Sequence, residues 1–204
     1  MSRLLLVRHG ETELNSAERY WGSTDVKLSQ AGMRQAEKLR DRLARYPINA
    51  VYSSNLTRAL TTAGIVASGR QLNVTTCAEL REIDFGELEG LTFGEISQLY
   101  PETAELWRQR SPKLEYPGGE DIAEFNYRIG QFVERLKNHG AQETILVVAH
   151  SGPLRSLMCH LLDISLERRW QFHLELASLS VLETYPEGAV LSLLNDISHL
   201  SGND

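Results

Sequence analysis

Two histidines stand at the ends of aliphatic runs, where proteins built on parallel sheets hold their ligands. His9 closes the run that begins at Leu4, and His150 directly follows Thr144–Ala149. Each run is apolar enough for a strand that is buried on both faces. Ligands of open α/β sheets bind beyond the carboxyl ends of the strands, so we expect both imidazoles to reach one crevice.

Two arginines and one carboxylate can join these histidines. Arg8 precedes His9, and Arg58 falls in the first turn of the helix expected after the strand Ala50–Ser54. A guanidinium group presents a planar fork that matches phosphoryl oxygens, and helix N-termini add N–H donors. Glu82 follows the third expected strand and is a candidate general acid. A single histidine or arginine at a strand end is usually structural or solvated, so the predicted phosphate pocket rests on the combination.

The composition limits the partners of the chain. Its 204 residues suit one domain with one substantial core. The net charge of −6 argues against the broad basic face of a nucleic-acid binder, so any anion site must be local. The apolar runs are far shorter than a bilayer span and no signal-peptide pattern precedes them. We therefore expect a cytoplasmic protein that contacts neither nucleic acid nor membrane.

The two cysteines, Cys77 and Cys159, lack the spacing of a zinc site or a redox pair, so both are expected to be buried thiols. Neither begins the Cys-x5-Arg pattern of a cysteine phosphatase, because Ile83 and Ser165 stand where the arginine would fall. That class of nucleophile is excluded.

The elements that position these residues alternate between strand and helix. Strands are expected at residues 4–7, 50–54, 74–80, 144–149, 178–184 and 189–194, and helices at 29–46, 56–67, 122–136 and after Gly152. This alternation predicts a three-layer α/β/α sandwich around a mostly parallel sheet with one antiparallel strand. We expect a single domain over residues 1–204, with a cap-like insertion at residues 91–119 where prolines and glycines interrupt regular structure.

Several segments together resemble the histidine phosphatase superfamily, which includes the cofactor-dependent phosphoglycerate mutases. The resemblance covers essentially the whole chain. The segments that carry it are Leu6–Asn15, Trp21–Asp25, Ser54–Ala59, Glu82, Phe85–Gly90, Pro117–Glu120 and Val148–Gly152.

The resemblance implies a phosphoglycerate mutase-like fold and a role for each site residue. The histidine matching His9 attacks phosphorus and becomes a phosphohistidine, and Glu82 matches the usual proton donor. No metal and no other cofactor is implied. The side chains expected to hold the phosphoryl oxygens are Arg8, Asn15, Arg58, His150 and Ser151, and candidate substrate contacts are Trp21 and Gly22.

The segment after Glu82 bears on the reaction. Mutases that resemble the glycolytic enzyme usually read Glu-Arg-His-Tyr-Gly there, whereas residues 82–90 look like a phosphatase, particularly the α-ribazole phosphatase-like branch. Leu88 and Ser151 depart from that branch, where tryptophan and glycine are common. A phosphatase of a small phosphorylated metabolite, with α-ribazole 5'-phosphate as one candidate in cobalamin biosynthesis, is the leading prediction. A phosphoglycerate mutase and a non-catalytic phosphate-binding protein are the alternatives.

The substrate and the assembly are less constrained. The side chains of the expected insertion do not indicate which substrate binds. Three tryptophans, Trp21, Trp107 and Trp170, are expected to pack rather than to form ligand platforms. A homodimer is the statistical default among homo-oligomers.

Overall fold

The computed structural model describes residues 2–14, 19–111 and 113–201, and its middle layer is a six-stranded sheet in the order β3-β2-β4-β1-β5-β6. The strands are β1 (Ser2–Arg8), β2 (Ile48–Ser54), β3 (Val74–Cys77), β4 (Thr144–Ala149), β5 (Leu179–Tyr185) and β6 (Gly188–Asp196). The α-helices are α1 (Gln30–Leu43), α2 (Thr57–Ala67), α3 (Phe93–Leu99), α4 (Pro101–Arg108), α5 (Ile122–Leu136) and α6 (Ser151–Leu161).

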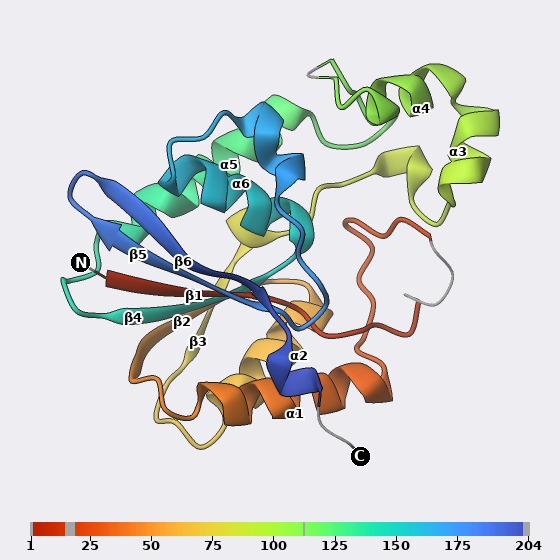
Figure 1. Cartoon of the computed structure of the whole chain (residues 1–204). Helices are drawn as coiled ribbons and strands as arrows, with labels where there is room; N and C mark the ends of the chain where they lie inside the picture. The colour runs from red at the N-terminus through yellow and green to blue at the C-terminus, as the bar shows by residue number, and fades with distance from the viewer. Residues whose placement is uncertain (1, 15–18, 112, 202–204) are drawn as a thin grey trace.

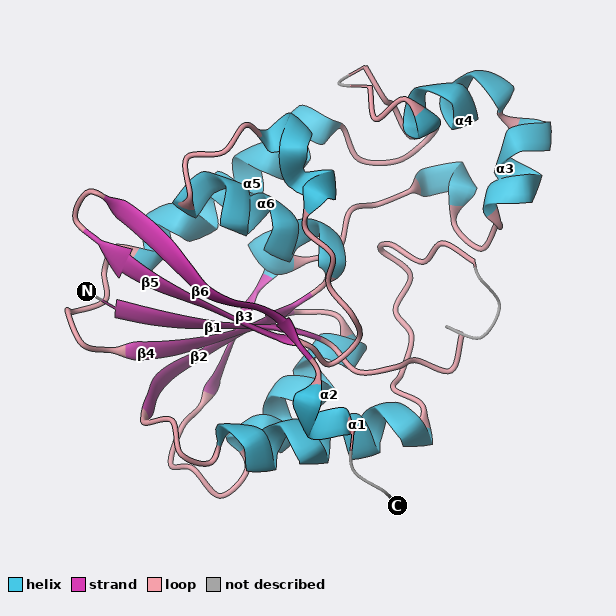
Figure 2. Cartoon of the chain, in the orientation of Figure 1, coloured by secondary structure: helices cyan, strands magenta, loops and turns pink. Residues whose placement is uncertain are grey.

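Strand pairing makes the sheet mostly parallel. β1 pairs parallel with β4, and β2 pairs parallel with both β4 and β3. β5 runs antiparallel to its two neighbours, β1 and β6. The predicted three-layer α/β/α fold with one antiparallel strand is therefore confirmed (Figure 2).

Helices cover both faces of the sheet, with α1 and α2 on one side and α5 and α6 on the other (Figure 1). Leu5 and Val7 of β1 pack into the core under α1 and α2, and Leu4 and Leu6 pack into the core under α5 and α6. Since successive strand residues face opposite sides, a strand between two helical layers needs an unbroken aliphatic run. This explains why the run that starts at Leu4 has no alternating pattern.

Side-chain caps define several helix starts. The Ser29 hydroxyl accepts a hydrogen bond from the Gly32 amide at 3.0 Å, which fixes the predicted start of α1. Asp121 caps α5 in the same way through the Ala123 amide at 2.6 Å. Both caps satisfy backbone donors that the helix itself leaves unpaired.

Several predicted boundaries are wrong by one to three residues; β1 and β2, for example, begin at Ser2 and Ile48 rather than at residues 4 and 50. The third strand ends at Cys77 rather than at residue 80, because residues 78–80 form a 3₁₀ turn that places Leu80 in the core under α5 and α6. α1 ends at Leu43 rather than at residue 46, where the chain has already turned. α6 begins at Ser151, directly after His150.

Residues 91–119, which we predicted to be a cap-like insertion, contain α3 and α4, and these helices stand beyond the end of the sheet at the upper right of Figure 1. Trp107 of α4 packs against Tyr20, Phe85 and Tyr116, with ring centroids 4.7, 5.5 and 5.4 Å away. Aromatic contacts thus join the insertion to the segment that follows Glu82.

Two further expectations concern single features. Cys77 and Cys159 are buried free thiols, as predicted. Among the helices of the described ranges, none combines the length and the apolarity needed to cross a bilayer.

Candidate active site

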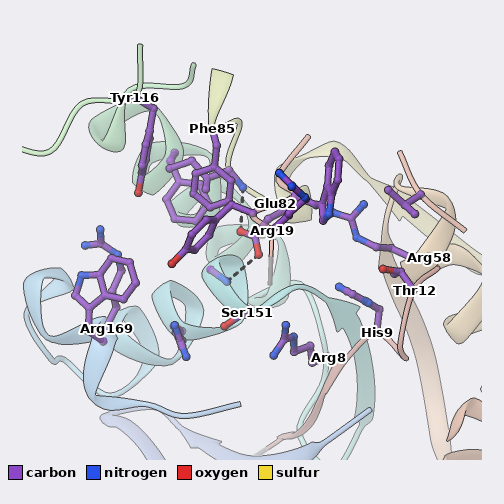
Figure 3. A pocket seen from close by; sticks show the side chains of 18 of the residues that line it. Arg8, His9, Thr12, Arg19, Arg58, Glu82, Phe85, Tyr116, Ser151 and Arg169 are labelled. Carbon is purple, nitrogen blue, oxygen red and sulfur yellow. Dashed lines mark hydrogen bonds between the residues drawn. The ribbon is translucent and has the colours of Figure 1, made fainter. Parts of the chain in front are cut away.

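A cavity of about 460 Å³ opens where β1 ends, and residues of the insertion, of α6 and of the 3₁₀ helix Leu166–Gln171 complete its wall. Six of the predicted site residues line it: Arg8, His9, Trp21, Arg58, Glu82 and Ser151 (Figure 3). His9 and His150 do end neighbouring strands, but only His9 lines the cavity, so the prediction that both imidazoles reach one crevice is wrong for His150. Asn15 lies outside the described residues.

His9 sits in the cavity wall with a fixed tautomer. Its Nδ1 lies 2.7 Å from the carbonyl oxygen of Gly10. A carbonyl only accepts hydrogen bonds, so Nδ1 carries the proton and Nε2 keeps the lone pair. Burial, followed by the charges of Arg58 and Arg8, holds the pKa of His9 well below its usual value. The imidazole is consequently neutral, as a nucleophile must be.

His150 is the neighbour of His9, with ring centroids 5.0 Å apart, yet it is fully buried and does not line the cavity. The Arg58 Nε donates to its Nδ1 at 3.2 Å, and its Nε2 lies 2.8 Å from the Ser54 hydroxyl. Because Nδ1 accepts, Nε2 carries the proton. Burial and the charge of Arg58 keep the pKa of His150 well below its ordinary value.

Arg58 is held by three protein acceptors, one for each of its guanidinium nitrogens. Besides His150, its terminal nitrogens donate to the Thr24 carbonyl at 2.8 Å and the Gly22 carbonyl at 2.7 Å. Gly22 also lets its loop pack against the segment that follows Glu82, because a Cβ there would lie 2.0 Å from the Ile83 carbonyl oxygen. The predicted residue Gly22 thus contacts Arg58 and does not line the cavity.

Arg8 is the second guanidinium beside His9. Its Nη1 donates to the Leu174 carbonyl at 2.6 Å, while its buried Nε has no hydrogen-bond partner among the described residues. Burial lowers the pKa of Arg8 to about 10, with the charge of Glu82 opposing the shift. The group remains a cation at neutral pH with donor capacity to spare.

Glu82 lines the cavity, and two backbone amides hold its carboxylate. Its Oε1 accepts from the Ile83 amide at 2.9 Å and its Oε2 from the Gly152 amide at 3.2 Å. A Cβ on residue 152 would lie 2.3 Å from the Glu82 Oε1, so a larger residue there would displace the carboxylate from this position. Both bonds fix the carboxylate at the N-terminal turn of α6.

Arg128 of α5 is a supporting residue that sequence reasoning missed. It donates to the carbonyl oxygens of Arg81 at 2.6 Å and Glu82 at 3.3 Å, and it pairs with Glu120 at 2.6 Å. Its guanidinium therefore holds the chain on either side of Glu82. The segment that contains Glu120 belongs to the family resemblance, but nothing in the sequence indicates which cation it pairs with.

The remaining wall of the cavity is aromatic and basic. Trp21, Trp107 and Trp170 all line it, and Trp107 at the same time packs against neighbouring aromatic rings as expected. Arg155 and Arg169 line it as well, and sequence reasoning missed both. The sequence offered one indication for Arg155: it lies in the first turns of the helix that follows His150, close to the expected end of a strand.

The chain matches the family model described as "Histidine phosphatase superfamily (branch 1)" over residues 4–197. It is 36% identical to phosphoserine phosphatase 1 of Hydrogenobacter thermophilus, over 98% of this chain and 95% of that protein. It is 33% identical to the adenosylcobalamin/alpha-ribazole phosphatase of Escherichia coli, over 95% of each chain. The crystal structure of the alpha-ribazole phosphatase from Shigella flexneri superposes with a TM-score of 0.88 at 32% identity, over 95% of this chain and 96% of that one. The chain belongs to the histidine phosphatase superfamily.

Proposed function

We propose that this protein hydrolyses phosphate monoesters of small metabolites through a phosphohistidine on His9. The observation that carries the proposal is the hydrogen bond from Nδ1 of His9 to Gly10, which leaves Nε2 as the nucleophilic nitrogen in a cavity lined by Arg8 and Arg58. Membership of the family and the phosphatases among the relatives support the same reaction.

In the first step, the Nε2 lone pair of His9 attacks phosphorus and the P–O bond to the leaving group breaks. Glu82, in its protonated form, gives its proton to the departing oxygen. Arg8 and Arg58 stabilise the charge that spreads over the other phosphoryl oxygens in the transition state. We assign Asn15 and Ser151 to the same oxygens, Ser151 because it lines the cavity.

In the second step, water attacks the phosphohistidine and the P–N bond breaks. Glu82, now a carboxylate, takes the proton from that water, and phosphate leaves with His9 restored as a neutral imidazole. Proton transfer of this kind contributes about 10² to 10⁴ in rate. Every group in the two steps is a side chain of this protein, and we propose that the reaction requires no metal ion.

We assign His150 the task of holding Arg58. A neutral ring whose Nδ1 accepts from the Arg58 Nε fixes the fork that receives the phosphoryl group. A contact between His150 and the phosphoryl oxygens would require its ring to exchange Ser54 or Arg58 for the substrate. Trp21 contributes an apolar part of the wall.

The rest of the cavity would receive the leaving group. We propose that residues 91–119 act as a cap on one domain spanning residues 1–204, because Trp107 and Tyr116 form part of the wall. Phosphoserine and α-ribazole phosphate, which the names of the relatives suggest, are the first substrates to assay. Two buried free thiols suit a reducing compartment, which supports action in the cytoplasm.

The direct test replaces His9 by alanine. His9→Ala should abolish hydrolysis of para-nitrophenyl phosphate and of the physiological candidates, and His160→Ala, an exposed histidine on α6, should leave it unchanged. Full activity in His9→Ala would refute the proposal. The mutase alternative is tested with 3-phosphoglycerate, with and without bisphosphoglycerate, where release of phosphate rather than isomerisation is expected.

A further inference from the structure

The charges that line the cavity are unbalanced. The arginines are Arg8, Arg19, Arg58, Arg155 and Arg169, and the one carboxylate among the described lining residues is Glu82. Arg19 is neutralised by Glu95 at 2.8 Å. Four guanidinium groups therefore face one carboxylate. A phosphate monoester brings at most two negative charges, so positive charge is left over when the substrate's phosphate is bound.

The surplus lies away from the nucleophile. In Figure 3, Arg169 and Tyr116 stand at the opposite end of the cavity from His9 and Arg58, with Glu82 between the two groups. Arg155, on the first turns of α6, shares a neighbour with Arg169. Their guanidinium carbons lie 6.0 and 4.8 Å from the ring centroid of Trp170. One aromatic ring thus holds two cations on the same stretch of wall.

Neither cation has an acidic partner of its own. Among the described residues, no ion pair involves Arg155 or Arg169, and the buried Nε of Arg155 has no hydrogen-bond partner. Arg169 donates one bond, from Nη1 to the Leu166 carbonyl at 3.1 Å. Burial lowers the pKa of both groups. Partly buried cations without a counter-ion are costly, so this arrangement favours a ligand that supplies the anion.

We propose that Arg155 and Arg169 form a second anion subsite that binds a carboxylate on the leaving group, so that the preferred substrates are phosphorylated hydroxy or amino acids. The inference rests on the proposed phosphatase activity and specifies its substrate class. When Glu82 holds the proton that the first step requires, a phosphate dianion leaves part of the charge of the four guanidinium groups uncompensated, so a carboxylate on the leaving group would still meet a cation. The two oxygens of a carboxylate also match the planar fork of a guanidinium group.

The Tyr116 hydroxyl is placed to assist. Its ring is buried and stands at the same end of the cavity as Arg169 (Figure 3). Burial raises the pKa of Tyr116, and the charge of Arg169 only partly opposes that rise. The phenol therefore stays protonated and can donate a hydrogen bond beside Arg169. Around this polar end, Phe85 and Trp107 give the wall an apolar surface for the carbon chain of a small acid.

The experiment uses matched pairs of substrates that differ in the carboxylate. Phosphoserine is compared with phosphoethanolamine, and 3-phosphoglycerate with glycerol 3-phosphate, by phosphate release from the full-length protein. The wild type should favour the carboxylate member of each pair at least about tenfold in kcat/KM. Arg155→Gln and Arg169→Gln should each remove most of that preference, a loss of about tenfold, which is the size expected for one charge-assisted hydrogen bond.

The control is Arg168→Gln, which removes an exposed arginine next to Arg169 that does not line the cavity. It should keep the preference of the wild type, and Arg169→Lys should restore part of what Arg169→Gln loses. An equal preference in wild type and Arg169→Gln would overturn the proposal. So would a wild type that hydrolyses α-ribazole phosphate, whose leaving group has no carboxylate, better than either acid.

Two further comparisons separate the remaining outcomes. Fructose 1,6-bisphosphate and fructose 6-phosphate test whether the subsite binds a second phosphate in place of a carboxylate. If Arg169→Gln lowered the preference in kcat/KM for the bisphosphate alone, and not for the carboxylate substrates, our assignment would be contradicted. The carboxylate-free esters and para-nitrophenyl phosphate report on phosphatase activity itself. If the wild type hydrolyses them without any carboxylate preference, the subsite is wrong and the phosphatase stands. If it hydrolyses no monoester, the proposed function fails.

Discussion

The two buried histidines carry their proton on different ring nitrogens. In each ring, the hydrogen-bond partner of Nδ1 decides which nitrogen is protonated. The Gly10 carbonyl takes the proton of Nδ1 in His9, whereas the guanidinium of Arg58 donates to Nδ1 in His150. Only His9 is left with a lone pair on Nε2. The same residue type therefore serves as the proposed nucleophile in one strand end and as a support for Arg58 in the other.

These low pKa values have a consequence for stability. The unfolded chain takes up protons on histidine near its ordinary pKa of about 6.5, while folded His9 and His150 stay neutral to a much lower pH. The unfolded state then binds more protons, so the free energy of unfolding should fall as the pH drops below about 6.5. Urea unfolding at several pH values between 7.5 and 5 measures this.

The matched variant is His9→Gln, which removes one of the two buried neutral imidazoles. Its stability should decline less steeply over the same pH interval than that of the wild type. An identical slope in the two proteins would mean that His9 titrates in the folded state as it does in the unfolded state.

At the scale of the elements, strand register and helix contacts place the site residues. β1 and β4 are paired in register, with Arg8 opposite Ala149, so His9 and His150 leave the sheet side by side. Glu82 follows β3, the strand at one edge of the sheet, and is not itself part of a strand. Strand pairing therefore does not fix its position. The α6 amide at Gly152 and the guanidinium of Arg128 place it instead.

The close contact at Gly152 predicts a local defect. Gly152→Ala puts a Cβ 2.3 Å from the Glu82 Oε1, so the carboxylate must move and kcat should fall toward the 10²- to 10⁴-fold loss expected without a general acid. Gly64→Ala is the control, since a Cβ there meets nothing within 4 Å in α2. It should raise stability by about 0.4–1 kcal/mol and leave kcat unchanged. Steady-state assays and thermal unfolding distinguish the two, and normal kcat in Gly152→Ala would contradict the role of Glu82.

The clamp formed by Arg128 predicts a combined effect. Arg128→Ala removes the donor to the carbonyls beside Glu82 and leaves Glu120 unpaired, which should cost about 1–3 kcal/mol of stability and lower kcat. Arg135→Ala, on the same helix, breaks only the exposed pair with Glu79 and should cost about 0–1 kcal/mol with unchanged kcat. Equal effects of the two variants on kcat would show that the clamp does not position Glu82.

At the scale of the whole molecule, the sequence predicts the features that depend on periodicity and fails where distant segments meet. The aliphatic runs and the helix Ile122–Leu136 were recognisable because buried strands and amphipathic helices have their own patterns. The candidate site residues were recognisable because strand ends converge in this architecture and because the family motifs are specific.

Other features depend on tertiary packing. The early end of β3 follows from the place of Leu80 in the core, and nothing in residues 74–80 signals it. The enclosure of His150 behind Arg58 depends on a contact between residues 92 positions apart. Arg155 and Arg169 line the same cavity only because the 3₁₀ helix Leu166–Gln171 packs beside α6, with Trp170 in the cavity wall. The sequence does not indicate that contact.

The most direct test of the proposed mechanism is to trap the covalent intermediate. The Glu82→Gln variant is mixed with para-nitrophenyl phosphate, whose leaving group needs little protonation, and is quenched at alkaline pH, where phosphohistidine survives. Intact-mass and peptide spectra should show one phosphoryl group on His9, accumulated because water is no longer activated, and none in His9→Ala or when His9→Ala is combined with Glu82→Gln. Hydrolysis by the wild type with no phosphoryl group ever found on His9, or with the label on another residue, would contradict it.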